Sequence, residues 1–428
     1  MRRNLVLLAL SILFISDTLA QIKSGPMLGY NTLREVGVWI ETEKPQSVEF
    51  QYWPQTDPSN KTIITQTTNQ RKGNTATFQT YLLEPGTTYN YQIIPEGSKA
   101  DDQKTYTFTT QSLWHWRTSP QDFSFLAGSC VFINEEAYDR PGKGYGGEYE
   151  IFTHMAEEEA DFMVWLGDNT YLREVDYDSR SGIYHRFSHS RNVAEMQDLL
   201  ANMHHYAIWD DHDYGPNDSD WTYPLKSLTK EAFFDYWPMP ARGVGGSEGI
   251  TNSFVYNDCQ FFLMDNRWYR EHAGRDNKII GDQQMAWLID ALRYSKANYK
   301  FICIGGQFLS DAALFENHAN FSNERQELID AIDQYGISNV IFLTGDRHHS
   351  EVSTLKTKNG TRIYDITSSP ITSTAYDHSH EPNRNRMGET IGERNYAKIQ
   401  ISGPFKERKI QVVFKNKKGE VVQTLALD

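Results

Sequence analysis

The chain has 428 residues, 39% hydrophobic and 23% charged, with 24 Tyr, 22 Phe and 10 Trp. This length suggests about two or three domains, and this composition excludes a largely disordered protein. The formal net charge of −14 predicts a surface that repels nucleic acids, so we expect no stable nucleic-acid binding and, for an anionic substrate, a local positive charge such as a bound metal.

The first 20 residues predict a secretory signal peptide. Arg2 and Arg3 precede the apolar run Leu5–Leu10, and small residues near Ala20 mark a cleavage point. The run is shorter than the about 20 residues that span a bilayer, which favours a signal peptide over a membrane anchor or a buried helix. We expect no transmembrane segment after its removal and a secreted or periplasmic protein, with attachment to a cell surface left open.

Residues 21–111 predict a small all-β sandwich domain. Alternating segments such as 36–40 and 48–52 are separated by turn-rich stretches. The segment 83–91 resembles the strand-and-corner segment of fibronectin type III domains. A linker is expected at 112–121.

Residues 122–428 predict an α/β domain, because strand-like runs alternate with amphipathic helical ones. Short strands return after about residue 360 and are expected to complete a second sheet. Segment 172–203 is either part of a pocket wall or a solvent-facing insertion. The expected strands are 123–127, 162–166, 205–209, 254–257, 261–265, 301–304 and 340–344, and the expected helices are 147–160, 224–236, 281–296 and 322–335.

Four of these strands end in polar clusters. Ligands bind beyond the carboxyl ends of strands in α/β sheets, so the four loops can converge. Carboxylates, imidazoles, a phenol and a thiol are metal ligands, and carboxylates packed together need a compensating charge. The pattern predicts a metal site; the alternative is four ordinary turns. The clusters are Gly128-Ser129-Cys130, Gly167-Asp168-Asn169-Thr170-Tyr171, Asp210-Asp211-His212-Asp213 and Gly345-Asp346-Arg347-His348-His349.

In this order the clusters resemble the PhoD-like alkaline phosphatases and phosphodiesterases of the metallophosphoesterase superfamily. The resemblance covers about residues 24–428 and implies a two-sheet β-sandwich flanked by helices, preceded by a small β-sandwich domain. It implies an exported enzyme with Fe³⁺ and a divalent ion, calcium before magnesium or manganese. The implied reaction is hydrolysis of a small phosphoester by attack of a metal-bound hydroxide, with monoesters favoured and diesters the close alternative.

The resemblance also implies roles for single residues. Asp168 would bridge the two metals, while Asp211 and His348 would bind the divalent ion. Asp210 could be the ligand instead of Asp211. We prefer Asp211, because Asp211 stands where other metallophosphoesterases have a metal-binding asparagine before a histidine. For Cys130 the alternative is a buried thiol. The implied Fe³⁺ ligands are Cys130, Asp168, Tyr171 and Asp346.

Three further residues are expected near the substrate. His212 is the candidate acid beside the leaving group; the alternative is a histidine that orients other side chains. Asn217 would either reach the divalent ion or orient its ligands. Arg267 would clamp a phosphate, unless it forms a structural ion pair with Asp265 or another acid.

One segment departs from the superfamily pattern. Most members have a metal-binding histidine in a Gly-His pair after the strand that corresponds to 301–304, whereas this chain reads Gly305-Gly306-Gln307-Phe308. Fewer nitrogen ligands favour calcium, magnesium or manganese over zinc.

Two other function classes fit parts of the sequence. A secreted binding protein could carry an inactive metallophosphoesterase-like domain, although it would not need so many like charges in one place. A glycosidase could use two carboxylates from 210–213, but this leaves Cys130 and Tyr171 without a role. The sequence does not fix the oligomeric state.

Overall fold

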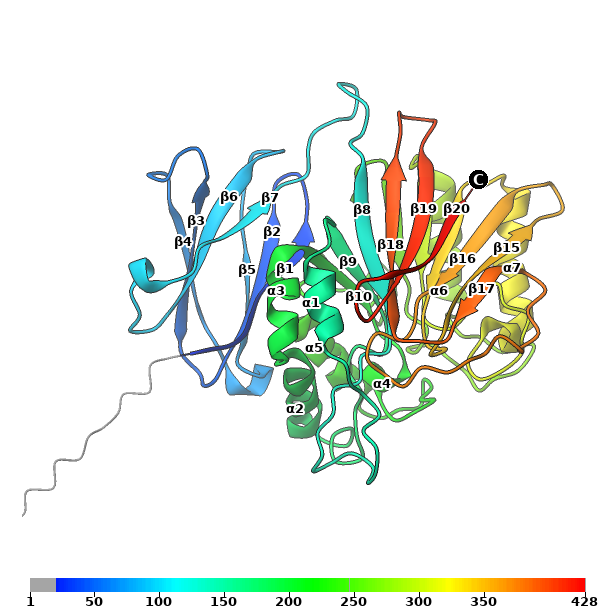
Figure 1. Cartoon of the computed structure of the whole chain (residues 1–428), viewed down its shortest axis with the longest axis horizontal. Helices are drawn as coiled ribbons and strands as arrows, with labels where there is room; N and C mark the ends of the chain where they lie inside the picture. Colours follow the sequence, from blue (N-terminus) through cyan, green and yellow to red (C-terminus); the bar gives the residue numbers. More distant parts are fainter. Residues whose placement is uncertain (1–20, 246, 428) are drawn as a thin grey trace, which may run out of the picture.

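The N-terminal part of the computed structural model is all-β, as expected (Figure 1). The structure describes residues 21–245 and 247–427, so the expected signal peptide lies outside the described residues. One layer is a four-stranded sheet of order β4-β3-β6-β7, and β1, β2 and β5 form the facing layer. The strands are β1 (Ile22–Asn31), β2 (Val36–Thr42), β3 (Ser47–Pro54), β4 (Thr62–Thr67), β5 (Thr75–Gln79), β6 (Thr88–Pro95) and β7 (Tyr106–Thr109).

Alternation of apolar and polar side chains holds these two layers together. In β3, Val48, Phe50 and Tyr52 are buried while the residues between them are partly exposed. The Phe50 ring lies 5.3 Å from Phe78 of β5 and 5.6 Å from Tyr91 of β6. The N-terminal strands therefore enclose an aromatic core of their own.

The first layer is continuous with the main sheet of the protein. β1 runs parallel to β10 with Leu28 opposite His204, and this pairing completes a nine-stranded sheet of order β20-β19-β18-β8-β9-β10-β1-β2-β5. Figure 1 shows the N-terminal strands extending this sheet. The added strands are β8 (Phe123–Gly128), β9 (Phe162–Leu166), β10 (His204–Ile208), β18 (Asn395–Ser402), β19 (Lys409–Asn416) and β20 (Val421–Leu427).

A seven-stranded sheet faces the nine-stranded one, in the order β11-β12-β13-β14-β16-β15-β17. Its other face is covered by helices, because Met285 and Leu288 of α6 pack with Phe262 and Phe342 of the sheet. The strands are β11 (Asn252–Tyr256), β12 (Cys259–Leu263), β13 (Tyr299–Cys303), β14 (Val340–Thr344), β15 (Ser350–Lys356), β16 (Arg362–Thr367) and β17 (Arg386–Ile391). The helices are α1 (Glu150–Ala156), α2 (Arg180–Arg191), α3 (Gln197–Asn202), α4 (Asp211–Tyr214), α5 (Lys226–Tyr236), α6 (Asp282–Tyr294) and α7 (Ser322–Gln334).

The two-sheet fold with flanking helices confirms the sequence-based fold class, and the expected strands and helices occur within a few residues of their predicted bounds. Segment 172–203, which the sequence left open, carries α2 and α3. Ile183 and Phe187 of α2 are buried, so this segment is not a solvent-facing insertion. Among the described residues, no helix is long and apolar enough to span a bilayer.

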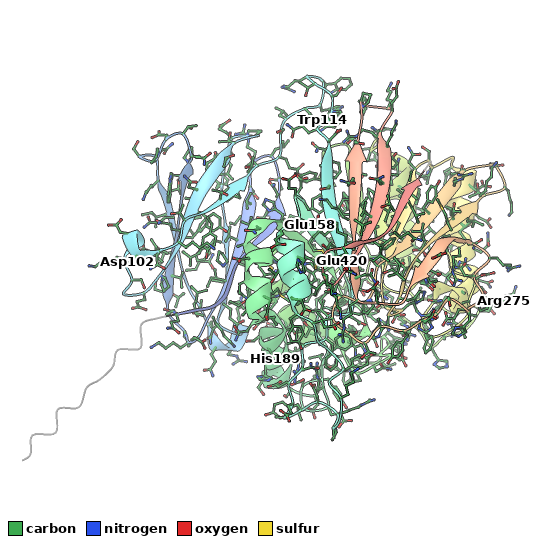
Figure 2. All side chains as sticks on the ribbon, in the orientation of Figure 1. Asp102, Trp114, Glu158, His189, Arg275 and Glu420 are labelled. Atoms are coloured by element: carbon green, nitrogen blue, oxygen red, sulfur yellow. The ribbon has the colours of Figure 1, made fainter. Side chains whose placement is uncertain are left out.

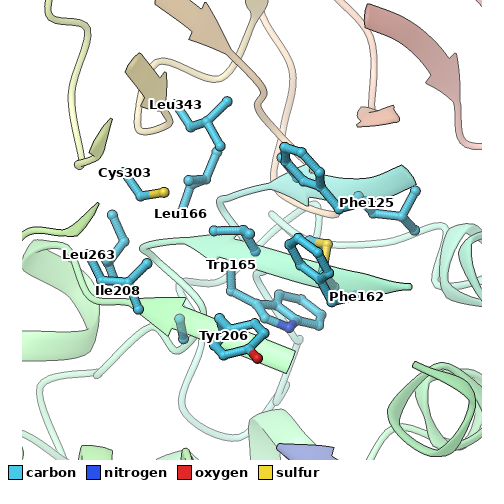
Figure 3. Packing of buried hydrophobic residues seen from close by; sticks show 14 of the residues in the cluster. Phe125, Phe162, Trp165, Leu166, Tyr206, Ile208, Leu263, Cys303 and Leu343 are labelled. Atoms are coloured by element: carbon cyan, nitrogen blue, oxygen red, sulfur yellow. The ribbon is translucent and has the colours of Figure 1, made fainter. Parts of the chain in front are cut away.

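Apolar side chains of the two sheets pack against each other, and Figure 3 shows Leu166 and Ile208 of one sheet on the side of Leu263 and Cys303 of the other. Aromatic rings add to this contact. Phe125 of β8 stacks on Phe162 of β9 at 5.0 Å between ring centroids, within the nine-stranded sheet. Its ring also meets Phe261 and Phe301 of the opposite sheet edge-on at 5.2 and 5.3 Å. These contacts fix the spacing of the two sheets, and thereby of the loops at their ends.

We expect Phe125→Ala to lower the free energy of unfolding by about 3–5 kcal/mol, because it removes a fully buried ring between two sheets. Urea unfolding would measure the change. Tyr294→Ala is the matched control: this side chain is 85% exposed, so its loss should change stability by no more than about 0.5 kcal/mol. A loss below about 1 kcal/mol for Phe125→Ala would contradict the central role of this ring.

Candidate metal centre

The four predicted clusters come together at the carboxyl ends of β8, β9, β10 and β14. The first three strands are parallel neighbours, and β14 belongs to the facing sheet. Two backbone contacts tie the first loops together: Cys130 N donates to Gly167 O at 3.3 Å, and Val131 N donates to Asp168 O at 2.7 Å. The expected convergence of the loops is thus present in the structure.

The backbone is strained where these side chains leave the strands. Cys130, Asp168, Asp346 and His348 have φ values of 61°, 53°, 70° and 54°. Non-glycine residues rarely adopt this left-handed conformation, and such strain collects at functional sites. Each of the four side chains therefore leaves a turn whose backbone conformation costs energy. Such a cost favours a functional role for these side chains over the alternative of four ordinary turns.

A first group of ligand atoms surrounds one oxygen of Asp168. Its Oδ2 accepts hydrogen bonds from the Cys130 thiol, with the sulfur at 3.6 Å, and from the Tyr171 hydroxyl at 3.2 Å. His348 joins the group, because its Nε2 lies 3.3 Å from the Tyr171 hydroxyl. Asp346 is placed through its backbone carbonyl, 3.5 Å from the Cys130 sulfur. The residues expected to hold Fe³⁺ are therefore neighbours.

A second group lies on the other side of Asp168. Its Oδ1 accepts a hydrogen bond from the backbone N–H of His212 at 3.3 Å. Ligand atoms of Asp168, Asp211 and His212 all lie within 4.8 Å of one another. The two oxygens of Asp168 thus have different neighbours: Oδ2 contacts Cys130 and Tyr171, and Oδ1 contacts the backbone N–H of His212.

Asp211 also belongs to a third set of acids. Its carboxylate, that of Asp210 and that of Glu316 lie within 4.8 Å of one another. The Asp218 N–H donates to Asp211 Oδ2 at 2.8 Å, while Asp210 caps α4 by accepting from Asp211 N. Asn217 precedes Asp218 in an exposed turn, and its expected role stays a prediction.

Arg267 is fully buried and paired with two acids. Its Nε donates to Asp210 Oδ1 at 2.6 Å, and its Nη1 donates to Glu316 Oε1 at 2.9 Å. Arg270 pairs with the same glutamate, with 2.5 Å between Nη2 and Oε1. Arg267 thus forms the structural ion pair that the sequence allows as an alternative to phosphate binding. Its partners are Asp210 and Glu316 rather than Asp265. A direct contact of Arg267 with substrate stays a prediction.

Burial and like charge make these acids hard to ionise. Burial raises the pKa of Asp168 well above its usual range, and the neighbouring Asp211 raises it further. The pKa of Asp346 is raised in the same way, by burial first and then by the charges of Asp210 and Glu316. Burial also raises the pKa of the Cys130 thiol to about 12. For Asp211 burial acts in the same sense, but His212 and Arg267 hold its pKa below the usual range.

The donor set fits metal ions. The buried side-chain oxygens Asp210 Oδ2, Asp346 Oδ2 and Asn266 Oδ1 have no hydrogen-bond partner among the described residues. A buried oxygen without a donor is unfavourable, and a cation would satisfy these oxygens and offset the repulsion between the carboxylates. Oxygen predominates among the candidate ligands, which suits a hard ion.

Gly305 closes one wall of this site. A Cβ at this position would lie 2.2 Å from Asp210 Oδ2 and 2.6 Å from Asn266 Nδ2, so no side chain fits there. The absence of a side chain at Gly305 therefore leaves this wall to the carboxylate of Asp210 and the amide of Asn266. The sequence reasoning missed Asn266 and Glu316 as site residues. Asn266 carried a signal, because it follows a strand, whereas Glu316 lies in a loop without a motif.

Histidines and tyrosines complete the surroundings. Tyr145 contacts His348, with its hydroxyl 3.1 Å from Nδ1. The His212 ring lies against Tyr171, with centroids 4.2 Å apart, and is partly exposed. His349 lies away from this group, with its Nδ1 3.1 Å from the carbonyl oxygen of Arg347, as the alternation of side chains suggests.

Comparisons with known proteins agree with this geometry. Residues 125–406 match the model of the PhoD-like phosphatases, and residues 19–113 match that of a domain of unknown function (DUF7800). Alkaline phosphatase D of Bacillus subtilis (strain 168) is 24% identical over 326 residues, which cover 64% of this chain and 53% of that enzyme. The chain thus matches about half the length of this curated relative.

Solved structures show the same fold. A structure of PhoD superposes with a TM-score of 0.75 at 16% identity, covering 96% of this chain and 93% of that one. A purple acid phosphatase from yellow lupin (Lupinus luteus) seeds superposes with a TM-score of 0.68 at 12% identity, covering 94% and 73%. Because the family model spans most of the α/β part, including all four clusters, the chain belongs to the PhoD-like phosphatase family.

Proposed function

We propose that the protein is an exported metal-dependent phosphoesterase that hydrolyses phosphate monoesters, with diesters as the close alternative. One observation carries this proposal: Cys130 and Tyr171 both contact one oxygen of the buried Asp168, and ligand atoms of Asp211 and His212 lie within 4.8 Å of the Asp168 carboxylate. Export rests on the signal sequence predicted at residues 1–20.

The first group of ligands would hold Fe³⁺, and the second would hold a divalent ion, calcium before magnesium or manganese. Cys130, Asp168, Tyr171 and Asp346 supply anionic ligands for a trivalent ion. Asp168 faces both groups, and Asp211 supplies oxygen ligands for the divalent ion. When bound, such ions neutralise charge on phosphate oxygens and lower the pKa of water.

The resemblance implies that His348 binds the divalent ion. Its Nε2 lies beside Tyr171, so we propose that this histidine acts at the boundary of the two groups. The Ser373 hydroxyl donates to the Tyr171 oxygen at 3.1 Å, which favours the anionic form of the phenol when it serves as a ligand.

His212 would act on the leaving group. Its backbone is fixed by the bond to Asp168, and its ring rests on Tyr171. Its Nε2 lies 3.9 Å from Asp211 Oδ2, so the ring is held between the acid and the phenol while it remains partly exposed. A histidine in this place can donate a proton to the oxygen that departs from phosphorus.

Chelation tests the proposed activity. We expect the purified protein to contain iron and a divalent ion, and to hydrolyse 4-nitrophenyl phosphate. Removal of the ions should abolish turnover, and their return should restore it, because the carboxylates alone repel a phosphate. A metal-free preparation that hydrolyses glycosides at full rate would instead support a glycosidase.

Visible absorption tests the iron ligands. A phenolate or thiolate bound to Fe³⁺ gives a coloured protein, so Tyr171→Phe should shift or bleach the band. Tyr145→Phe is the matched control, because Tyr145 contacts His348 without being a proposed ligand. An iron-loaded wild type without colour would overturn the assignment of Cys130 and Tyr171.

The role of His212 is tested by the leaving group. We expect His212→Ala to lower kcat by about 10²–10⁴-fold on alkyl phosphates, whose leaving groups need a proton, and less on 4-nitrophenyl phosphate. Metal content, measured by elemental analysis, should stay unchanged. His154→Ala is the control, because it removes a histidine of α1 that pairs with Glu157, and it should leave both rates unchanged. Equal losses on both substrates would argue for a role in orienting other residues.

A further inference from the structure

Apolar side chains are exposed on four neighbouring loops at one end of the molecule. The loops are the turn between β1 and β2, the segment between β5 and β6, the linker 111–121, and the turn between β18 and β19. A single exposed apolar side chain is ordinary on a protein surface, whereas a group of them on adjoining loops marks an interaction site. We call this group the end face; its members are Leu33, Tyr81, Leu82, Leu113, Trp116 and Phe405.

The four loops contact one another. The backbone N–H of Gln111 donates to Thr32 O at 3.3 Å, and Gln111 O accepts from the N–H of Gly86 at 3.0 Å. The linker therefore touches the turn after β1 and the segment before β6. On its other side, the ring of Trp114 lies 5.6 Å from that of Phe405, between β18 and β19. The end face is thus one surface rather than four separate loop tips.

Two members of the end face combine a strained backbone with an exposed apolar side chain. Leu82 and Trp116 have φ values of 51° and 66°, and their side chains are 60% and 90% exposed. Lys406, next to Phe405, has a φ of 73°. Bulky residues rarely adopt this left-handed conformation, and burial of an apolar side chain does not explain it here. Backbone strain of this kind collects at functional sites.

The end face carries an excess of positive charge, although the whole chain has a formal net charge of −14. The side chains of Arg117, Lys406 and Lys409 are exposed, and Arg117 Nη1 donates to the carbonyl oxygen of His115 at 3.0 Å rather than to an acid. An anionic surface would therefore be attracted to this end of a protein that it otherwise repels. The charged residues of the four loops are Arg34, Arg117, Lys406, Arg408 and Lys409 against Glu35, Glu84 and Glu407.

We propose that the end face binds a lipid bilayer that contains anionic lipids. Trp and Tyr favour the boundary between headgroups and hydrocarbon, because each ring is apolar and carries one polar group. Basic side chains beside them are attracted to anionic headgroups. The linker and the turn between β18 and β19 project beyond the sheets (Figure 1), a shape that can enter a flat bilayer surface, whereas a small ligand needs a concave site. This inference is independent of the proposed phosphoesterase activity.

The candidate metal centre lies away from the end face. Figure 1 shows the linker and the turn between β18 and β19 at the opposite end of the molecule from α4, which begins at Asp211. Figure 2 shows Trp114 at the same end as the linker, away from His189 of α2. A bilayer bound at the end face would therefore leave the candidate metal centre open to the aqueous phase.

Co-sedimentation with vesicles tests the proposal. The probes are phosphatidylcholine vesicles with and without phosphatidylglycerol. The protein is the chain that begins at Gln21, so that residues 1–20 cannot account for binding. We expect binding to both, and tighter binding when phosphatidylglycerol is present. Trp116→Ala should weaken binding to both vesicles about tenfold, through loss of buried apolar area. Lys406→Ala should weaken binding about fivefold on the anionic vesicles alone.

Trp221→Ala is the matched control. Trp221 is 54% exposed, but its N–H donates at 2.9 Å to the carbonyl oxygen of Arg270, which pairs with Glu316 near the candidate metal centre. Its replacement should leave vesicle binding unchanged. Fluorescence quenching by brominated lipid adds a second readout: Trp116→Phe should keep most of the binding and lose part of the quenching, because it removes an indole that enters the bilayer.

Four outcomes would overturn the proposal. The first is no binding to either vesicle, and the second is unaltered binding in Trp116→Ala or an equal loss in Trp221→Ala. The third is retention of the wild type on insoluble cellulose instead of vesicles, lost in Trp116→Ala, which would assign the exposed rings to a saccharide. The fourth is concentration-dependent association of the wild type in sedimentation velocity, abolished by Trp116→Ala, which would assign the end face to a second copy of the chain.

Discussion

Asp168 and Asp211 are buried beyond the ends of two strands, and the partly buried Asp346 follows a third. The repulsion between these acids is the constraint that the surrounding structure has to meet. Burial raises the pKa of Asp168 and Asp346, and each of these residues adopts a left-handed backbone conformation. Such an arrangement is costly unless cations are bound. The two facing sheets supply the rigidity that holds the carboxylates in place, because the rings of Phe125 and Phe261 fix the distance between strands of opposite sheets.

The same need for compensation explains the position of Arg267. A buried guanidinium between Asp210 and Glu316 neutralises acids that would otherwise add to the negative charge beside Asp211. It also orients Asp210, whose other oxygen remains without a hydrogen-bond partner among the described residues. Arg267 thus acts on the charge of the candidate metal centre through its two acidic partners, and removal of one member of such a buried cluster would leave an unpaired charge.

Much of the fold and of the site could be predicted from the sequence because the signals were local. Asp168 and Asp346 each follow a glycine at the end of an apolar strand, and this placement alone indicates a ligand loop. Glu316 could not be found in this way, because its role depends on a contact with Arg267 across 49 residues of sequence. Helix α2 could not be predicted for a related reason. Its buried face includes the charged Arg186, which pairs with Asp176 and Glu135 inside the protein, so the face does not appear in the sequence as an apolar pattern.

The pairing of β1 with β10 connects this site to the N-terminal strands. β10 ends just before Asp210 and Asp211, so the strand that positions these carboxylates is also the strand on which the N-terminal part is built. His204 of β10 reinforces the junction, since its Nδ1 lies 2.9 Å from the carbonyl oxygen of Gly29. A separate domain on a flexible linker could move freely relative to the metal centre, whereas strands in one sheet cannot. The N-terminal strands are therefore held in a fixed position relative to the carboxylates that follow β10.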